Sequence, residues 1–183
     1  MLLTELGWNI KVIVPPVEEF SVPGEDPEEM VFRLSYAKAL SVYEKFPDSW
    51  IIGADTVVVA GDEVFGKPAD HEDALSMIKK LQGKKHTVIT GVALIAPDGR
   101  KLLEAEKTTV KFRPLNDREI LSYLESGESF DKAGSYAIQG QGMLLVESIE
   151  GCYFNVVGLP LHRLSRMFAD LGWPLAEQWR EKS

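Results

Sequence analysis

Apolar and polar positions along the chain follow two periods, one typical of strands and one typical of helices. Strand patterns combine β-branched residues with alternating apolar and polar positions, and turn residues separate one strand from the next. They predict strands over Trp8–Val14, 51–60, 63–65, 86–96 and a segment ending at 109–113. Two or three further short strands are expected between Ala133 and Val157, including one over Ser135–Gln139.

Helical periodicity comes with clear start and stop signals. Each predicted helix begins at a capping residue or a proline, and most end at a glycine. The predicted helices run from Asp26 to about Phe46, from Asp70 to Gly83, from Asn116 to Gly127 and from Pro160 to Gly172, with a short fragment over Leu2–Leu6. The order predicts one mixed α/β domain over residues 1–183, in which hairpins alternate with single helices.

Composition narrows the class of protein. The 183 residues are 45% apolar and 26% charged, as expected for a globular chain. A net charge of −8 argues against binding a nucleic acid polymer, which needs a basic face, but allows a small polyanion bound with local lysines and a divalent cation. No apolar run approaches the roughly 20 residues of a membrane span, and no signal peptide is visible. The single cysteine, Cys152, fits a reducing cytoplasm.

The strand predicted over 51–60 carries a carboxylate and a hydroxyl at its middle. Burying the Asp55 charge is costly unless it is paired or bound to a metal, so Asp55 and Thr56 indicate a site or, alternatively, a polar pair on an edge strand. Lys67 follows between Gly66 and Pro68, where ligand contact and exposure are both open. An acid on a strand and a cation beyond it suit metal-assisted chemistry on a phosphate.

Three other side chains are candidates for the same chemistry. Lys38 lies on the apolar stripe of its helix, so it either extends to solvent or meets an anion. Glu19 lies in a loop after two prolines, where a solvated surface charge is the simpler interpretation. Gln139 lies in a glycine-bracketed turn and either hydrogen-bonds a base edge or has no function. His86 is interpreted as an ordinary strand histidine.

Taken in order, these segments resemble the Maf family of nucleoside triphosphate pyrophosphatases. The resemblance rests on motifs spread over nearly the whole chain. They are Glu19, Lys38-Ala39, Gly53-Ala54-Asp55-Thr56, Gly66-Lys67-Pro68, Thr90-Gly91-Val92, Asp131-Lys132-Ala133-Gly134, Ile138-Gln139-Gly140 and Gly158-Leu159-Pro160. The resemblance implies a two-lobed α/β fold, similar to that of inosine triphosphatases, with an elongated mixed sheet flanked by helices and the active site in a central cleft.

The resemblance also implies an activity and roles for residues. Family members hydrolyse the α–β phosphoanhydride bond with Mg²⁺ or Mn²⁺, giving a nucleoside monophosphate and pyrophosphate. On that pattern Asp55 is the general base and a metal ligand, Glu19 is a second carboxylate near the metal, and Lys38 and Lys67 bind phosphates. Thr56 and Gln139 resemble the branch acting on dTTP and UTP, with modified pyrimidine nucleotides also open. A homodimer is allowed.

Family members begin with a strand and a Ser- and Arg-containing loop that holds the triphosphate, whereas this sequence starts at Met1-Leu2-Leu3, after that loop. Either the natural start lies upstream or the loop is absent. The second case leads to an alternative hypothesis, a catalytically impaired nucleotide-binding or regulatory protein. A haloacid-dehalogenase-like phosphatase is disfavoured because that chemistry needs an Asp two residues after the first, where Val57 stands.

Overall fold

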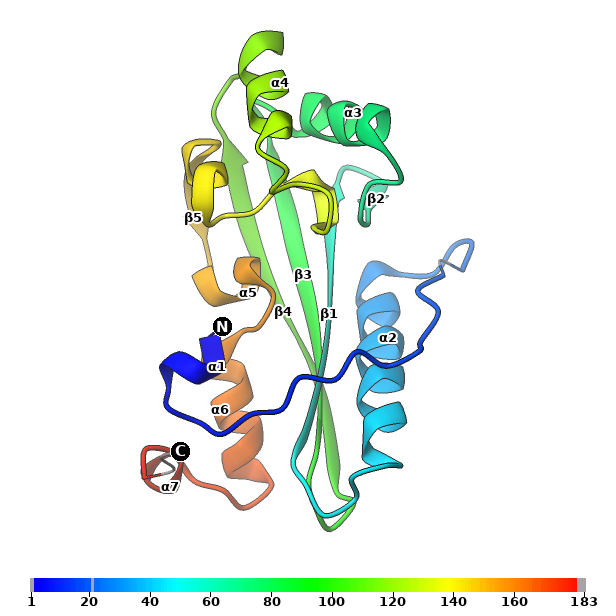
Figure 1. Ribbon diagram of the computed structural model, residues 1–183, viewed down its shortest axis with the longest axis vertical. Coiled ribbons are helices and arrows are strands. Elements are labelled where there is room, and N and C mark those ends of the chain that lie inside the picture. The colour runs from blue at the N-terminus through cyan, green and yellow to red at the C-terminus, as the bar shows by residue number, and fades with distance from the viewer. Residues whose placement is uncertain (1, 21, 181–183) are drawn as a thin grey trace. The chain divides into compact units, whose positions relative to one another are not determined.

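The computed structural model describes residues 2–20 and 22–180, which form two compact units. Unit 1 comprises Met1–Asp55, Gly91–Ala105 and Leu159–Ser183, and unit 2 comprises Thr56–Thr90 and Glu106–Gly158. Five strands follow one another across a sheet in the order β2-β1-β3-β4-β5 (Figure 1). They are β1 (Ile51–Ala60), β2 (Glu63–Phe65), β3 (Lys85–Ile95), β4 (Lys101–Phe112) and β5 (Val146–Glu150).

The α/β class is confirmed, and the described strands form an antiparallel sheet rather than the mixed sheet that was expected. Two of the four neighbouring pairs, β1 with β2 and β3 with β4, are joined by tight turns, which can join only antiparallel neighbours. Strand β1 turns into β2 at Gly61, with Ala60 opposite Glu63, and β3 turns into β4 where the Ala96 N–H donates to the Arg100 carbonyl at 2.8 Å. Strand β5 pairs antiparallel with β4.

Unit 1 packs a helix on each face of its strand segments. Helix α2 (Pro27–Tyr43) begins as predicted, because the Asp26 side chain accepts from the Glu28 N–H at 2.8 Å. It packs very closely on β1: a Cβ on Gly53 would lie 2.2 Å from the Ser35 carbonyl oxygen. Helix α6 (Leu161–Asp170) contributes Leu164 and Phe168 to a second core with alternate residues of β3.

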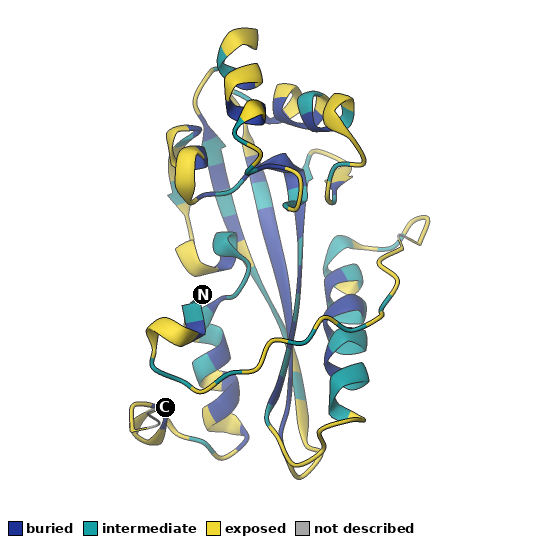
Figure 2. Ribbon diagram, in the orientation of Figure 1, coloured by how far each residue is buried: buried dark blue, intermediate teal, exposed yellow. Residues whose placement is uncertain are grey.

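Unit 2 packs its helices around one larger core. Helix α3 (His71–Leu81) is capped by Asp70, and α4 (Asp117–Glu125) has the capping box predicted between Asn116 and Glu119. Both turn their apolar sides inward and their polar sides to solvent (Figure 2). The core side chains come from both helices, from β1 to β4 and from the segment after α4, for example Ile78, Val88, Phe112, Leu124 and Tyr136.

Two regions differ from the sequence-based predictions. Residues 8–14 form no strand; Trp8 instead packs its ring 5.5 Å from that of Phe168 and donates its Nε1–H to the Gln178 carbonyl. Contacts of the Trp8 side chain, rather than backbone hydrogen bonds to a neighbouring strand, therefore hold this segment in place. The described chain begins with a short helix, α1 (Leu2–Glu5). Helix α6 is not the last helix, because a short helix, α7 (Leu175–Gln178), follows it.

The segment from Ala133 to Val157 contains one strand, β5, rather than two or three. The residues before it form two 3₁₀ turns, η1 (Ala133–Ser135) and η2 (Gly140–Leu144), and α5 (Tyr153–Val157) follows it. Gly134 and Gly140 take positive φ values of 68° and 61°, which an extended strand does not accommodate. The predicted strand over Ser135–Gln139 is therefore wrong. Among residues 2–20 and 22–180, no helix has the length and apolar character of a membrane span.

Candidate active site

Asp55 is a buried acid on β1, with a relative exposure of 8%. Side chains of a strand alternate between its two faces, so Asp55 shares a face with Ile51 and Gly53, the face that packs against α2. The close approach permitted by Gly53 brings the middle of α2 beside this acid. A buried carboxylate is costly without a partner, and α2 supplies one.

Lys38 of α2 contacts two carboxylates. Its Nζ donates to Asp55 Oδ1 at 2.6 Å and lies 2.6 Å from Glu19 Oε1. The Lys38 side chain is 19% exposed, that of Asp55 9% and that of Glu19 37%, so the cluster extends from the interior of unit 1 to its surface. Of the two interpretations open for Lys38, contact with anions is confirmed, and Glu19 is more than a solvated charge.

The electrostatics of the cluster keep the ammonium group charged. Burial acts to lower the pKa of Lys38, but hydrogen bonds and charge attraction from Asp55 and Glu19 outweigh it, and the pKa is raised above its ordinary value. Lys38 therefore remains protonated over the neutral range. A polyanionic ligand can replace the two carboxylates as the partner of the Lys38 ammonium group. A metal ion can replace the ammonium group as the partner of the two carboxylates.

Arg33 supports the loop that carries Glu19, and sequence reasoning missed it. Its guanidinium donates from Nε and Nη2 to both carboxylate oxygens of Glu25, each at 2.6 Å, and from Nη2 to the Phe20 carbonyl at 3.0 Å. It also stacks over the Phe20 ring, 4.9 Å from the centroid. The residue after Glu19 is thus fixed to α2. The charge of Asp55 contributes to the raised pKa of Arg33, after the larger effect of Glu25.

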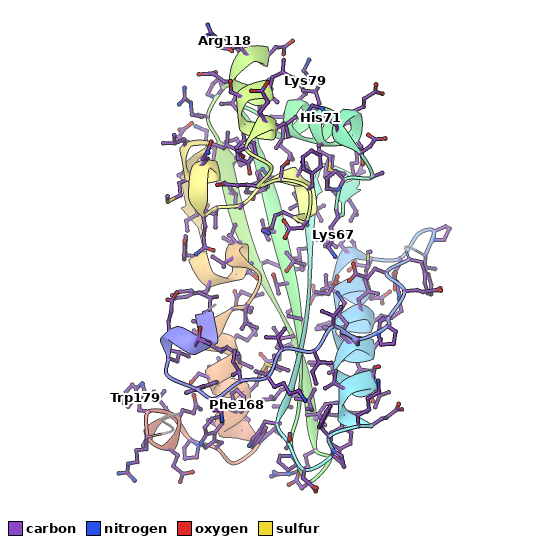
Figure 3. All side chains as sticks on the ribbon, in the orientation of Figure 1. Lys67, His71, Lys79, Arg118, Phe168 and Trp179 are labelled. Atoms are coloured by element: carbon purple, nitrogen blue, oxygen red, sulfur yellow. The ribbon has the colours of Figure 1, made fainter. Side chains whose placement is uncertain are left out.

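In unit 2, Lys67 lies exposed in the turn after β2 (Figure 3). The turn is held by a hydrogen bond from the Gly134 N–H to the Gly66 carbonyl at 3.0 Å. Asp131 and Lys132, which precede Gly134, form an ion pair at 2.6 Å. Lys132 is the main cause of the lowered pKa of Asp131, and Lys67 lowers it further, so two cations and one acid lie near each other here.

Gln139 also belongs to unit 2 and is exposed, between η1 and η2. The buried side chain of Ile138 anchors the turn beside it. His86 is an ordinary core histidine: it is 3% exposed and hydrogen-bonded through Nε2 to the Tyr136 hydroxyl at 2.8 Å. The structure thus brings Glu19, Lys38 and Asp55 into one cluster and places Lys67 and Gln139 in unit 2.

Thr56 does not share the face of β1 that Asp55 occupies, because adjacent strand residues project to opposite faces. Its hydroxyl lies 2.9 Å from that of Thr90, which donates to the Asn155 carbonyl of α5 at 3.0 Å. Since Thr90 has one hydroxyl proton, Thr56 donates to Thr90. Thr56 therefore takes part in the packing of α5 on the sheet.

The residues present fit a hard divalent cation. Mg²⁺ in nucleotide sites is held by one or two carboxylates together with substrate phosphates, and Glu19 and Asp55 gather two carboxylates at one ammonium group. Within the described part of the chain, no group of three or more His, Cys, Asp or Glu side chains could form a complete metal site. This donor set suits a cation that arrives with its phosphates rather than a permanently bound one.

These observations describe an α/β protein in which a buried acid on strand β1 is paired with a lysine on helix α2. The family model for Maf-like proteins matches residues 1–171, and the chain belongs to this family. It is 46% identical over 174 residues to a dTTP/UTP pyrophosphatase of Symbiobacterium thermophilum, covering 95% of this chain and 89% of that protein. Proteins of the same name from Ruminiclostridium cellulolyticum and a Thermoanaerobacter species are 47% and 49% identical, over 93% and 89% of this chain and 89% and 86% of theirs.

Proposed function

We propose that this protein is a nucleoside triphosphate pyrophosphatase, which hydrolyses the α–β bond of dTTP and UTP to the monophosphate and pyrophosphate. The observation that carries the proposal is the contact of one lysine, Lys38, with both Asp55 and Glu19 at 2.6 Å. Three residues far apart in sequence meet there, at the positions where the family pattern has its acid, lysine and second carboxylate. The names of the curated relatives support the choice of nucleotides.

In the proposed mechanism, Asp55 accepts the proton of a water molecule that attacks the α-phosphorus in line with the departing pyrophosphate. A general base of this kind contributes about 10²- to 10⁴-fold to the rate. Lys38 neutralises charge on the phosphate oxygens. Because those oxygens compete for its ammonium group, substrate binding loosens its pairs with Asp55 and Glu19 and leaves both carboxylates able to act.

A divalent cation, Mg²⁺ or Mn²⁺, would be held by Glu19 and Asp55 and would supply charge neutralisation at the phosphates. In unit 2, Lys67 is the proposed phosphate contact and Gln139 the proposed base contact. Thr56 receives no substrate contact, because its hydroxyl is used by Thr90 and faces away from the Asp55 side of β1. A cytoplasmic location and a homodimer stay predictions.

The test measures pyrophosphate release from UTP, dTTP, CTP, ATP and GTP with Mg²⁺ or Mn²⁺, in the parent protein and in Asp55→Asn. The parent should favour UTP and dTTP. The Asn variant keeps the shape of the side chain but cannot accept the proton, so its kcat should fall about 1,000-fold. Thermal unfolding checks that the variant is folded. A folded Asn variant as fast as the parent would remove Asp55 from its role, and equal turnover of all five nucleotides would refute the pyrimidine assignment.

A further inference from the structure

The turn that carries Gln139 is held at both ends, by a side chain of α4 and by one from the segment that follows α4. On the N-terminal side, the Ala137 N–H donates to the Tyr123 hydroxyl at 3.1 Å. On the C-terminal side, the Gln141 N–H donates to Glu128 Oε2 at 2.8 Å. Gln139 lies midway between these two bonds. Its backbone position is therefore set by two residues outside the motif that contains it.

Glu128 is itself fixed to α4. Gly127 ends the helix with a φ of 76°, and its N–H donates to the Leu124 carbonyl. The Glu128 N–H then donates to the Ser126 hydroxyl at 3.3 Å, and that hydroxyl donates to the Tyr123 carbonyl at 2.6 Å. The Glu128 carboxylate is thus held next to the C-terminal end of α4. The Asn116 capping box stabilises the N-terminal end of the same helix.

Glycines allow the turn to approach its supports. A Cβ on Gly140 would lie 2.6 Å from each Glu128 carboxylate oxygen, and its φ of 61° favours glycine in any case. A Cβ on Gly142 would lie 2.0 Å from the Ala137 carbonyl oxygen and 3.2 Å from the Tyr123 hydroxyl. The two glycines after Gln139 therefore have a steric reason: Gly140 leaves room for the Glu128 carboxylate, and Gly142 leaves room for the Ala137 carbonyl and the Tyr123 hydroxyl.

We infer that Glu128 and Tyr123 are positioning residues that set the nucleotide selectivity of the protein through the Gln139 turn. The inference rests on the proposed function, because it takes Gln139 as the residue that contacts the base. An amide side chain discriminates between bases only if its donor and acceptor are held in register with the base edge, and a displacement of about 1 Å is enough to lose the match. Neither residue touches the substrate in this account.

The experiment compares the ratio of kcat/KM for UTP to that for ATP in the parent and in Glu128→Ala. The ratio should fall about tenfold in the variant, with kcat for UTP changed far less, because the turn moves while the Lys38 cluster of unit 1 is untouched. Glu128→Gln keeps an oxygen that can accept from the Gln141 N–H and should restore most of the ratio. Glu125→Ala removes the same charge from an exposed position at the end of α4 and should leave the ratio unchanged.

Gly140→Ala supplies an independent perturbation of the same contact. It should lower the ratio about as much as Glu128→Ala, and the double variant should be no worse than the poorer single one, because both changes break one contact. A Glu128→Ala protein that folds and keeps the parental UTP to ATP ratio would overturn the inference. So would Gln139→Ala with unchanged selectivity. A parent that releases no pyrophosphate from any nucleotide would instead refute the proposed function.

Discussion

The two units bury an ionisable side chain in opposite ways. In unit 1, Lys38 keeps its charge inside the protein because Asp55 and Glu19 both contact it. In unit 2, His86 lies between the edges of Phe112 and Tyr136, and burial lowers its pKa to about 4, so it is neutral. A buried side chain that stays charged because it is paired, such as Lys38, is therefore a better indicator of an active site than one that is buried in its neutral form, such as His86.

The largest test of this comparison removes the buried charge. Lys38→Met keeps most of the length of the side chain but leaves Asp55 and Glu19 without a cation between them, and it removes a contact to the phosphates. We expect kcat/KM for UTP to fall about 1,000-fold, or about 4 kcal/mol. Steady-state pyrophosphate release measures the loss.

Lys101→Met is a matched control for the Lys38 variant, because Lys101 in the same unit contacts only the Tyr36 ring and hydroxyl in the bonds described. It should change activity less than twofold. If Lys38→Met were folded and retained more than a tenth of the parental activity, the cluster would be a structural ion pair, and the contrast with His86 would disappear.

The second test uses the neutral histidine of unit 2. Below pH 6.5 the unfolded chain takes up a proton at His86 that the folded protein does not bind until about pH 4, so stability must fall as the pH falls through this interval. The loss attributable to His86 is about 3 kcal/mol. Urea unfolding at pH 7 and pH 4 should show a correspondingly smaller difference for His86→Gln, whose amide can still bond Tyr136.

Other acids also titrate in this range, so the comparison with the parent protein isolates the histidine. His71→Gln makes the same substitution at an exposed histidine of the same unit and serves as the matched control for the change of side chain. An identical pH dependence in the parent and in His86→Gln would mean that folding does not lower the pKa of His86.

Sequence patterns singled out two members of the charged cluster because these lie on regular elements. Asp55 and Lys38 lie on a strand and a helix whose periodicities fix their faces, and each stands out as a charge at an apolar position. Local signals also fixed the starts of α2, α3 and α4. The antiparallel sheet was less accessible, since pairing depends on contacts between distant segments rather than on local pattern.

The supports of the candidate site were not predictable in this way. Arg33 and Glu128 act through hydrogen bonds to loops whose paths the sequence does not specify, and a charged residue within a helix or shortly after one looks like ordinary surface. Ser135–Gln139 was predicted to be a strand because its apolar residues alternate. Gly134 and Gly140 then place that segment in turns with positive φ, where tertiary packing overrides the period.

The third test concerns the support of the charged cluster. Arg33→Lys keeps the charge but loses the fork that binds Glu25 and the Phe20 carbonyl together, so the loop with Glu19 is held less firmly. We expect Mn²⁺ to bind about tenfold more weakly in the presence of a non-hydrolysable UTP analogue, or about 1.4 kcal/mol, with kcat at saturating Mn²⁺ within about twofold of the parent. Electron paramagnetic resonance of free Mn²⁺ measures the affinity.

Arg163→Lys is the control for Arg33, since it alters an arginine of the same unit whose Nη1 donates to Glu104 at 2.6 Å, away from the loop with Glu19. Its Mn²⁺ affinity should equal that of the parent. If Mn²⁺ affinity fell equally in both variants, or did not fall in Arg33→Lys, Arg33 would not position the loop with Glu19. The position of Glu19 would then depend on its contact with Lys38.

The smallest expected effect is at Thr56, and it bears on how residues are transferred from a family pattern. Thr56→Val removes the proton donated to Thr90, at a cost of about 1 kcal/mol of stability, while Thr90 still donates to the Asn155 carbonyl. The UTP to ATP selectivity should stay within about twofold of the parent, since Thr56 projects away from the face of β1 that holds Asp55. A tenfold change in selectivity without a change in melting temperature would show instead that Thr56 contacts the nucleotide. In that case the family motif would locate the base-contacting residue better than strand geometry does. Both faces of β1, and not only the face with Asp55, would then contribute to the site.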